Sequence, residues 1–146
     1  MLGSRILDIA VMDLYAGSGA LGIEALSRGA ATATFVERDQ RCVSILRQNL
    51  DALGYAGRAT VVRADAAAWV ELNPTAVSRA GAVFIDPPYR DAVLPRLLEL
   101  LATSVAGGAD VVVEHGRTDS PALPAGLQVV RERRYGATAV TVLRKP

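Results

Sequence analysis

The sequence predicts an α/β domain built on a mostly parallel β-sheet, and three observations predict it. Short apolar runs alternate with helical patterns through residue 114. Each run is almost continuously apolar, as expected of parallel strands that are buried on both faces. After residue 115 the alternation stops, and a loop rich in Pro and Gly over residues 118–126 leads into two strand-like runs around a turn at residues 135–137. Those last runs predict an antiparallel hairpin that closes the sheet.

The pattern places each element along the chain. We expect strands at the end of residues 6–15 and over residues 32–37, 59–64, 82–86, 109–114, 127–134 and 138–144. We expect helices over residues 19–28, 40–53, 66–72 and 91–102. Apolar side chains recur at helical spacing in three of these helices, at Leu21, Ala25, Leu26, Val43, Leu46, Leu50, Leu53, Leu94, Leu97, Leu98 and Leu101. Gly54 closes the second helix as a C-terminal cap.

The composition bounds the class of protein. The 146 residues, 51% of them hydrophobic, suit one domain over residues 1–146 with a sizeable core. No apolar run approaches the roughly 20 residues that span a bilayer, and the start of the chain lacks the pattern of a signal peptide. The single cysteine, Cys42, excludes an internal disulfide and multi-cysteine zinc sites. Because a single cysteine fits a reducing compartment, we expect a cytoplasmic location. With only one histidine, His115, we expect no metal site.

The charge balance limits how the chain could hold a nucleic acid. The formal net charge is +1 and the pI is about 7.9, whereas a free-standing nucleic-acid binding domain usually has a pI above about 9. Five basic residues concentrate at the predicted terminal hairpin, namely Arg131, Arg133, Arg134, Arg144 and Lys145. They could contact phosphates, although a solvated strand edge commonly carries such charges too. A local patch or another segment would therefore have to supply the affinity.

A glycine-rich loop follows the first predicted strand and opens the first helix. It runs from Asp13 to Gly22 as Asp-Leu-Tyr-Ala-Gly-Ser-Gly-Ala-Leu-Gly. Gly17 and Gly19 allow a sharp turn and a close approach of the backbone to a ligand, and open α/β sheets bind ligands at this strand end. Glu37, at the end of the second strand, could accept hydrogen bonds from both hydroxyls of a ribose. These features predict an adenosyl cofactor, but enzymes that use NAD share them.

Asp13 favours S-adenosylmethionine over NAD as that cofactor. It stands four residues before Gly17, where dinucleotide folds usually keep an apolar residue. A carboxylate there suits the ammonium group of S-adenosylmethionine, directly or through water, and the N–H groups of the loop suit its carboxylate. The alternative is that Asp13 merely caps a turn. We expect cofactor contacts from Asp13, Tyr15, Ala16, Gly17, Ser18, Gly19, Glu37, Arg38, Asp65, Ala66 and Asp86.

Two of these residues have a second interpretation that the sequence leaves open. Asp65 ends the third predicted strand, where its carboxylate could accept a hydrogen bond from an adenine amino group. It could equally cap the helix that begins at Ala66, and the two roles are compatible. Tyr15 could pack beneath the cofactor or fill the core.

The segment from Asp86 to Tyr89, with the sequence Asp-Pro-Pro-Tyr, directly follows the fourth predicted strand. Methyl transfer to an amine needs acceptors for its protons, a free lone pair and a fixed position. Asp86 and the carbonyl of Pro87 could accept the two N–H groups, while Pro87 and Pro88 stiffen the loop. Tyr89 offers a ring on which a base could stack once flipped out of a helix. We therefore expect these four residues to be catalytic, although a double proline also simply ends strands.

These segments together resemble the RsmD-like family, whose members methylate the exocyclic amine of a guanine in small-subunit ribosomal RNA. The resemblance rests on residues 13–30, 35–39, Asn49, residues 86–89 and residues 135–136. It covers nearly the whole chain. The run at residues 25–30, Ala-Leu-Ser-Arg-Gly-Ala, makes it much more specific than the glycine loop alone.

The resemblance implies a Rossmann-like class I S-adenosylmethionine-dependent methyltransferase fold with a seven-stranded sheet whose last strand is antiparallel. It implies Glu37 on the ribose, Asp65 near the adenine, and Asp86 to Tyr89 around the target amine. It implies small-subunit ribosomal RNA, or the assembled small subunit, as the partner of what we expect to be a monomer. Family members usually carry a further basic N-terminal segment, which we expect to be missing because only residues 1–12 precede Asp13.

Other interpretations stay open at this point. The same motifs serve adenine amino-methyltransferases that act on DNA or RNA. An NAD-dependent oxidoreductase would share the glycine loop and Glu37, although it gives the Asp-Pro-Pro-Tyr segment no role and Asp13 argues against it. A non-catalytic cofactor-binding module is the third alternative, since a segment of the family is missing. His115 is a weak candidate for a general base, because the proton can leave to water after transfer.

Overall fold

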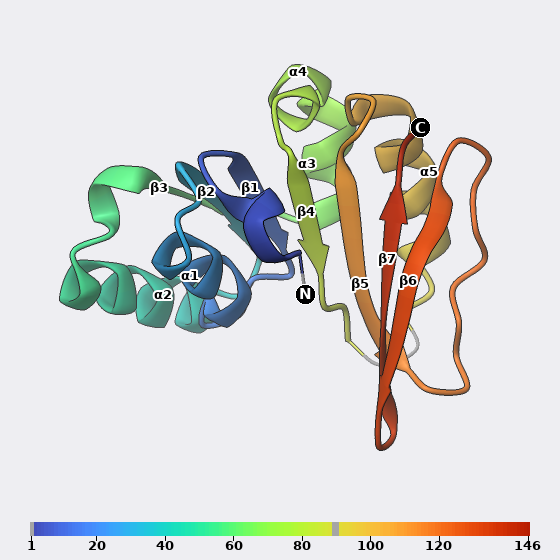
Figure 1. Cartoon of the computed structure of the whole chain (residues 1–146). Coiled ribbons are helices and arrows are strands. Elements are labelled where there is room, and N and C mark those ends of the chain that lie inside the picture. Colours follow the sequence, from blue (N-terminus) through green and yellow to red (C-terminus); the bar gives the residue numbers. More distant parts are fainter. Residues whose placement is uncertain (1, 89–90) are drawn as a thin grey trace.

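Seven strands form one sheet at the centre of the molecule, which the computed structural model describes over residues 2–88 and 91–146. The strands are β1 (Ala10–Leu14), β2 (Thr32–Glu37), β3 (Ala59–Arg63), β4 (Ala82–Ile85), β5 (Asp110–Gly116), β6 (Gln128–Tyr135) and β7 (Thr138–Arg144). They lie in the order β3-β2-β1-β4-β5-β7-β6 (Figure 1). Strands β1 to β5 pair in parallel, and β7 runs antiparallel to both β5 and β6. The predicted mostly parallel sheet with a terminal antiparallel hairpin is confirmed.

The order of the strands reverses at β1, which lies between β2 and β4. Sheets of this kind bind ligands in the crevice outside the carboxyl ends of the strands at such a reversal. Asp13 lies near the carboxyl end of β1, Glu37 ends β2, and Asp86 directly follows β4. The topology therefore gathers the three carboxylates that the sequence singled out at one edge of the sheet.

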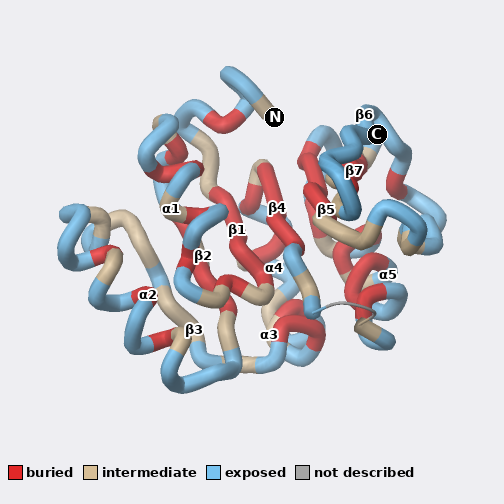
Figure 2. Tube along the Cα trace, turned by 90° about the horizontal axis from the view of Figure 1, so that it is seen from below, coloured by how far each residue is buried: buried red, intermediate tan, exposed pale blue. Residues whose placement is uncertain are grey.

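Helices cover both faces of the sheet (Figure 1). One face carries α1 (Ala20–Ser27) and α2 (Gln40–Leu53), and the other carries α3 (Ala66–Leu72), α4 (Pro74–Ser78) and α5 (Leu94–Ser104). Two short 3-10 turns, η1 (Gly3–Ile6) and η2 (Ala56–Arg58), complete the described elements. Buried residues lie along the central strands and on the helix sides that face them (Figure 2). None of the described helices is long and apolar enough to cross a membrane.

The two cores on either side of the sheet follow from the alternation of side chains along each strand. Phe35 and Phe84 point to the face of α1 and α2, where they join Leu46 in one cluster. Ile85 points to the opposite face, where it joins Leu97 in the other cluster. Phe35, Leu46, Ile85 and Leu97 are fully buried, and each such side chain contributes roughly 1.5–3 kcal/mol of transfer free energy.

Helix boundaries differ from the prediction in places that bear on the site. Helix α5 begins at Leu94 instead of residue 91, because Pro95 lacks an N–H group and is tolerated only in the first turn. Asp91 instead lies in the preceding turn, where its side chain accepts the N–H of Val93 at 2.8 Å. The helix α4 was not predicted, and it begins with Pro74 at a position that proline favours. Leu53, expected on the apolar face of α2, is exposed.

Two strands are longer than predicted. Strand β5 continues to Gly116, so that His115 lies within the strand and pairs with Ala139 of β7. Strand β6 continues to Tyr135, which was assigned to the turn and instead pairs with Thr138. Both extensions depend on pairing with β7, which local sequence patterns do not contain.

Candidate active site

The glycine loop leaves the carboxyl end of β1 and turns into α1 through left-handed backbone conformations. Tyr15, Gly17 and Gly19 have φ values of 61°, 57° and 92°. A Cβ atom on Gly19 would collide with Leu46, and one on Gly22 would collide with the ring of Phe35. A Cβ atom on Gly17 would meet nothing within 4 Å. The left-handed backbone favours glycine at Gly17 and Gly19, and packing against the Phe35 ring favours it at Gly22.

Asp13 anchors the first helix from within the sheet. Its side chain is 1% exposed, and its Oδ2 atom accepts the N–H of Gly22 at 3.0 Å. Gly19 is the N-cap residue of α1 but has no side chain to satisfy the first turn, so that Asp13 takes this capping role from a distance. Burial raises the pKa of Asp13 to about 7, while the Gly22 N–H lowers it and the charges of Asp86 and Glu37 raise it further. The capping interpretation of Asp13 is thus confirmed, and it leaves the ligand role untouched.

Glu37 ties the glycine loop to the end of β2. Its Oε1 atom accepts the N–H of Gly17 at 2.9 Å, and its Oε2 atom accepts the N–H of Asp39 at 2.7 Å. Asp39 in turn caps α2 by accepting the N–H groups of Arg41 and Cys42. Each carboxylate oxygen can accept about two hydrogen bonds. The carboxylate of Glu37 is therefore held in place and keeps acceptor capacity for a ligand hydroxyl.

Two cavities lie along this edge and share the lining residues Tyr15, Glu37 and Pro88. The first, of about 460 Å³, is lined by Asp13, Tyr15, Ala16, Gly17, Ser18, Ala20, Leu21, Glu37, Asp86, Pro87 and Pro88. The second, of about 330 Å³, is lined by Tyr15, Val36, Glu37, Arg38, Ala64, Asp65, Ala66, Pro88, Asp91 and Val93. We call the two together the loop groove. It brings together the residues predicted to contact a cofactor, apart from Gly19, which packs against Leu46 instead.

Asp65 and Tyr15 both line the far part of the loop groove. The Oδ2 atom of Asp65 accepts the N–H of Ala68 at 3.0 Å, which confirms that Asp65 caps α3. Partial burial raises the pKa of Tyr15 above its ordinary value, and the nearby carboxylate of Asp91 adds to that effect. Tyr15 therefore lines the groove as a partly buried ring, on the same wall as Asp91.

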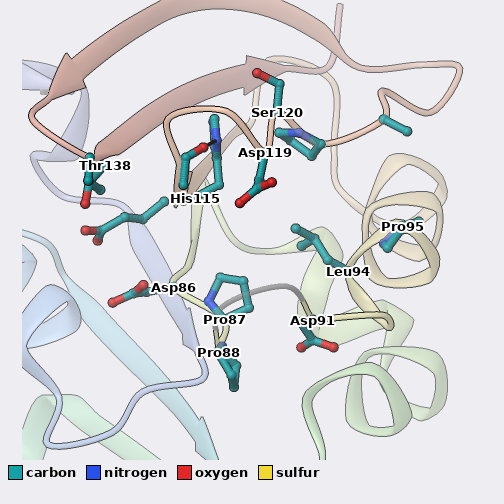
Figure 3. A pocket seen from close by; sticks show the side chains of 15 residues that line it. Asp86, Pro87, Pro88, Asp91, Leu94, Pro95, His115, Asp119, Ser120 and Thr138 are labelled. Atoms are coloured by element: carbon teal, nitrogen blue, oxygen red, sulfur yellow. Dashed lines mark hydrogen bonds between the residues drawn. The ribbon is translucent and has the colours of Figure 1, made fainter.

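A third cavity, of about 540 Å³, is also lined by Asp86, Pro87 and Pro88 (Figure 3). We call it the outer cavity. It is lined by Asp86, Pro87, Pro88, Asp91, Leu94, Pro95, Glu114, His115, Gly116, Asp119, Ser120, Pro121, Ala122, Ala137 and Thr138. The segment from Asp86 to Pro88 therefore lines both the loop groove and the outer cavity. Tyr89, predicted as the fourth catalytic residue, lies outside the described residues.

Carboxylates near this junction have perturbed ionisation. Partial burial raises the pKa of Asp86 above its ordinary value. Burial also raises the pKa of Glu114, and the charge of Asp86 adds to that effect. A charged Asp86 thus disfavours ionisation of Glu114. Perturbed groups beside a cavity are typical of functional sites.

His115 makes two hydrogen bonds that occupy both ring nitrogens. Its Nδ1 atom lies 2.8 Å from the carbonyl oxygen of Gly116, which can only accept, so that Nδ1 carries the proton. Its Nε2 atom lies 2.7 Å from the hydroxyl of Thr141 and accepts that hydrogen in the neutral ring. His115 therefore holds β5 to β7 and has no nitrogen free to act as a general base.

The basic residues of the hairpin divide into structural and exposed groups. Arg144 lies 2.7 Å from the buried carboxylate of Asp110, which also pairs with Arg5 at 2.8 Å. Lys145 donates to the carbonyl of Val105 at 2.9 Å. Arg131, Arg133 and Arg134 lie on β6, whose eight residues are all exposed. The predicted patch of five cations is therefore reduced to the three arginines of β6.

Residues that the sequence did not single out complete the outer cavity. They are Asp91, Glu114 and Asp119, and each brings a carboxylate to the wall. Asp119 lies in the loop at residues 118–126, which the sequence showed only as a connection rich in Pro and Gly. Among the described residues, no group of three or more metal-ligating side chains is placed to hold a metal ion.

The chain is similar over nearly its whole length to a known family. A family model described as Conserved hypothetical protein 95 matches residues 1–144. The Ribosomal RNA small subunit methyltransferase D of Escherichia coli is 36% identical over 147 residues, which cover 99% of this chain and 72% of that protein. This chain belongs to the RsmD-like family. A second relative of this chain, YlbH of Bacillus subtilis, is 36% identical to it over 92% of this chain and 74% of the length of YlbH.

Solved structures agree with the assignment to the RsmD-like family. The methyltransferase yhhF of Escherichia coli is 36% identical, with a TM-score of 0.85 over 99% of this chain and 79% of that chain. An RNA methyltransferase of Salinibacter ruber, solved with S-adenosyl-L-homocysteine, is 21% identical, with a TM-score of 0.75 over 99% of this chain and 87% of that chain. The second likeness shows the fold alone, and it supports the class I methyltransferase architecture.

Proposed function

We propose that this RsmD-like chain transfers a methyl group from S-adenosylmethionine to the exocyclic amine of a guanine in small-subunit ribosomal RNA. One observation carries the proposal: the segment from Asp86 to Pro88 lines both the loop groove and the outer cavity. A reaction that joins a cofactor to a base needs such a junction, because the reacting atoms must meet in line. The name of the Escherichia coli relative supports small-subunit ribosomal RNA as the substrate.

The residues of the loop groove fit S-adenosylmethionine. The acceptor capacity of Glu37 suits the two ribose hydroxyls, and the open space at Gly17 admits a ligand against the backbone. The carboxylate of Asp13 lines the same cavity and suits the ammonium group. Asp65, Arg38 and Ala66 line the far part, where the adenine would lie. When bound, the cofactor supplies an electrophilic methyl group on its sulfonium sulfur.

Asp86 and Pro87 orient the amine of the target base. The Asp86 carboxylate and the Pro87 carbonyl accept its two N–H groups, which leaves the nitrogen lone pair directed toward the methyl group. Pro87 and Pro88 restrict the backbone, so that these acceptors keep their direction without a cost in entropy at the moment of reaction. The proton released after transfer passes to water, since both ring nitrogens of His115 are engaged.

We further propose that the enzyme acts as a monomer in the cytoplasm and that β6 contributes to holding the RNA. Arg133 and Arg134 are exposed on this edge strand, although Arg134 also pairs with Glu132 at 3.3 Å. Each phosphate contact of this kind releases a counterion, so that RNA binding weakens as salt increases.

Calorimetry and a transfer assay test the proposal together. The chain should bind S-adenosylmethionine and not NAD, and it should transfer a labelled methyl group to small ribosomal subunits isolated from cells that lack the corresponding activity. Binding of NAD without S-adenosylmethionine would overturn the proposal. Cofactor binding without transfer, by this chain and by a version extended at its N-terminus, would favour a non-catalytic module instead.

A further inference from the structure

The outer cavity contains a carboxylate oxygen that the fold leaves without a partner. The Oδ2 atom of Asp119 is buried and has no hydrogen-bond partner among the described residues. Buried polar atoms in native proteins are paired in the great majority of cases, because an unpaired one loses its hydration without replacement. An orphan atom on a cavity wall therefore points to a ligand that donates a hydrogen.

The position of Asp119 is set by its own loop. Its backbone N–H donates to the carbonyl of Gly116 at 2.9 Å, which closes a tight turn directly after β5. The side chain points from this turn into the outer cavity, toward Pro87 and Leu94 (Figure 3). The carboxylate thus faces the space beside the segment that orients the target amine.

The walls of the outer cavity indicate what kind of group enters it. Its volume of about 540 Å³ lies within the range of ordinary small-molecule sites. Leu94, Pro95 and Pro121 form apolar parts of the wall, and Asp86, Asp91, Glu114 and Asp119 bring carboxylates to it. Such a wall repels a phosphate and favours a flat, uncharged ring that presents N–H donors. A nucleobase meets this description.

We infer that Asp119 recognises the N1–H group of the target guanine and so selects guanine over adenine. The inference rests on the proposed function. In guanine the N1–H lies beside the exocyclic amine on the same edge, so that a base held by Asp86 through its amine presents N1–H to the neighbouring wall. In adenine the corresponding N1 atom carries a lone pair and no hydrogen, and it would repel the carboxylate. Asp119 is a specificity residue, whereas Asp86 and Pro87 hold the reacting amine.

A guanine analogue separates this role from a general role in binding. 2-Aminopurine keeps the exocyclic 2-amine, but its N1 atom carries a lone pair as in adenine. The experiment measures kcat/KM for an RNA that carries guanine at the target position, mapped with the wild-type enzyme, and for the same RNA with 2-aminopurine there. The wild type should prefer guanine by roughly 10- to 100-fold, since the contact is a buried hydrogen bond to a charged group.

The decisive variant is Asp119→Asn, which keeps the shape of the side chain and can donate to N1 of 2-aminopurine. It should lower kcat/KM for guanine by a similar factor and reduce the preference for guanine to within a few-fold. Asp119→Ala should also lose the preference, without a gain for the analogue. Asp51→Asn, the same change at an exposed carboxylate on α2, serves as the matched control and should leave both values unchanged.

The outcomes distinguish this inference from the proposed function. Calorimetric affinity for S-adenosylmethionine and the thermal melting temperature show whether each variant is folded. A folded Asp119→Asn enzyme with an unchanged preference for guanine would overturn the inference, as would an equal loss on both RNAs. If the wild type transferred no methyl group to guanine at all, the proposed function itself would fail. If Asp119→Asn does not fold, the test rests on Asp119→Ala and on the preference of the wild type between the two RNAs.

Discussion

The loop groove and the outer cavity both carry carboxylates, but the fold uses them differently. Asp13, Glu37 and Asp65 in the loop groove each accept at least one backbone N–H group, and these bonds hold α1, the glycine loop and α3. In the outer cavity, the Oδ2 atom of Asp119 has no partner among the described residues. The carboxylates of the loop groove thus stabilise the fold, whereas the outer cavity contains a buried carboxylate oxygen with no hydrogen-bond partner in the described part of the chain.

This difference suggests a division of roles between cofactor and RNA. A groove whose acceptors are already fixed can bind a small cofactor with little reorganisation. A cavity with an unsatisfied carboxylate gains most when the correct base enters, so that it discriminates between bases. Substitutions in the loop groove should therefore affect stability and cofactor affinity together, whereas substitutions in the outer cavity should affect transfer alone.

The largest expected effect is on transfer at Asp86. Asp86→Ala removes an acceptor for the target amine and should lower kcat by roughly 100- to 1,000-fold. Asp86→Asn keeps one acceptor oxygen and should retain more activity. Cofactor affinity, measured by calorimetry, should stay within a few-fold for both variants. A comparable loss of cofactor affinity would show that Asp86 holds the cofactor, and it would contradict the division of roles between the loop groove and the outer cavity.

Glu37→Ala should show the opposite pattern. It removes the acceptors for the N–H groups of Gly17 and Asp39, which should cost about 1–3 kcal/mol of folding stability. The affinity for S-adenosylmethionine should fall roughly 10- to 100-fold, because the ribose hydroxyls lose their acceptors as well. Urea denaturation and calorimetry measure the two effects. Loss of affinity at unchanged stability would mean that the loop does not depend on Glu37.

Asp13 should make stability depend on pH. Its pKa is raised to about 7 from 3.8, mainly by burial, so that the folded state holds a proton which the unfolded state releases between those values. Stability should therefore fall as pH rises through this range, by at most about 4 kcal/mol from this group. Asp13→Asn keeps an acceptor for the Gly22 N–H and removes the titration.

The contribution of Asp13 is isolated by comparing the two proteins at pH 5 and pH 8. Asp86 and Glu114 also have raised pKa values, and both proteins retain these two groups, so that the difference between the proteins reports mainly on Asp13. The wild type should lose more stability than Asp13→Asn between these conditions. Parallel losses would contradict a buried, protonated Asp13 in the folded state.

The smallest effect is expected at β6. Arg133→Gln should weaken RNA binding by less than about tenfold and reduce its salt dependence by roughly one counterion. Arg144→Gln is the matched control, because Arg144 pairs with the buried carboxylate of Asp110. Arg144→Gln should lower the folding stability and leave the RNA affinity unchanged. Filter binding at several salt concentrations measures the RNA affinity, and thermal melting measures the stability. Equal changes in RNA affinity and in stability for the two variants would contradict the different roles given to Arg133 and Arg144.

The comparison also shows what could be predicted from the sequence. The loop groove is built from residues that follow strands directly, so that the positions of Asp13, Glu37 and Asp65 were predictable from local pattern. The cofactor contact expected of Gly19 stays a prediction, but its packing against Leu46 is a contact between distant segments that no local pattern shows. Asp119 was not predicted, because a loop rich in Pro and Gly gives no sign of which side chain turns inward.

The fold shows the same limit. The helix over residues 40–53 was predicted at its observed bounds, since its cap and its apolar spacing lie within the segment. The end of β5 was placed two residues too early, because Gly116 is in the strand only through pairing with Thr138 of β7. The start of α5 was placed three residues too early, although Pro95 marked the first turn. Local chemistry predicts elements well, and tertiary pairing decides where they end.

The most direct test of the account is the identity of the methylated nucleoside. Small ribosomal subunits from cells that lack the activity are incubated with this chain and S-adenosylmethionine, and their RNA is digested to nucleosides and analysed by mass spectrometry. The account predicts N2-methylguanosine as the methylated nucleoside, with wild-type enzyme and not with Asp86→Ala. Methyladenosine as the product, or an undiminished yield from Asp86→Ala, would contradict it.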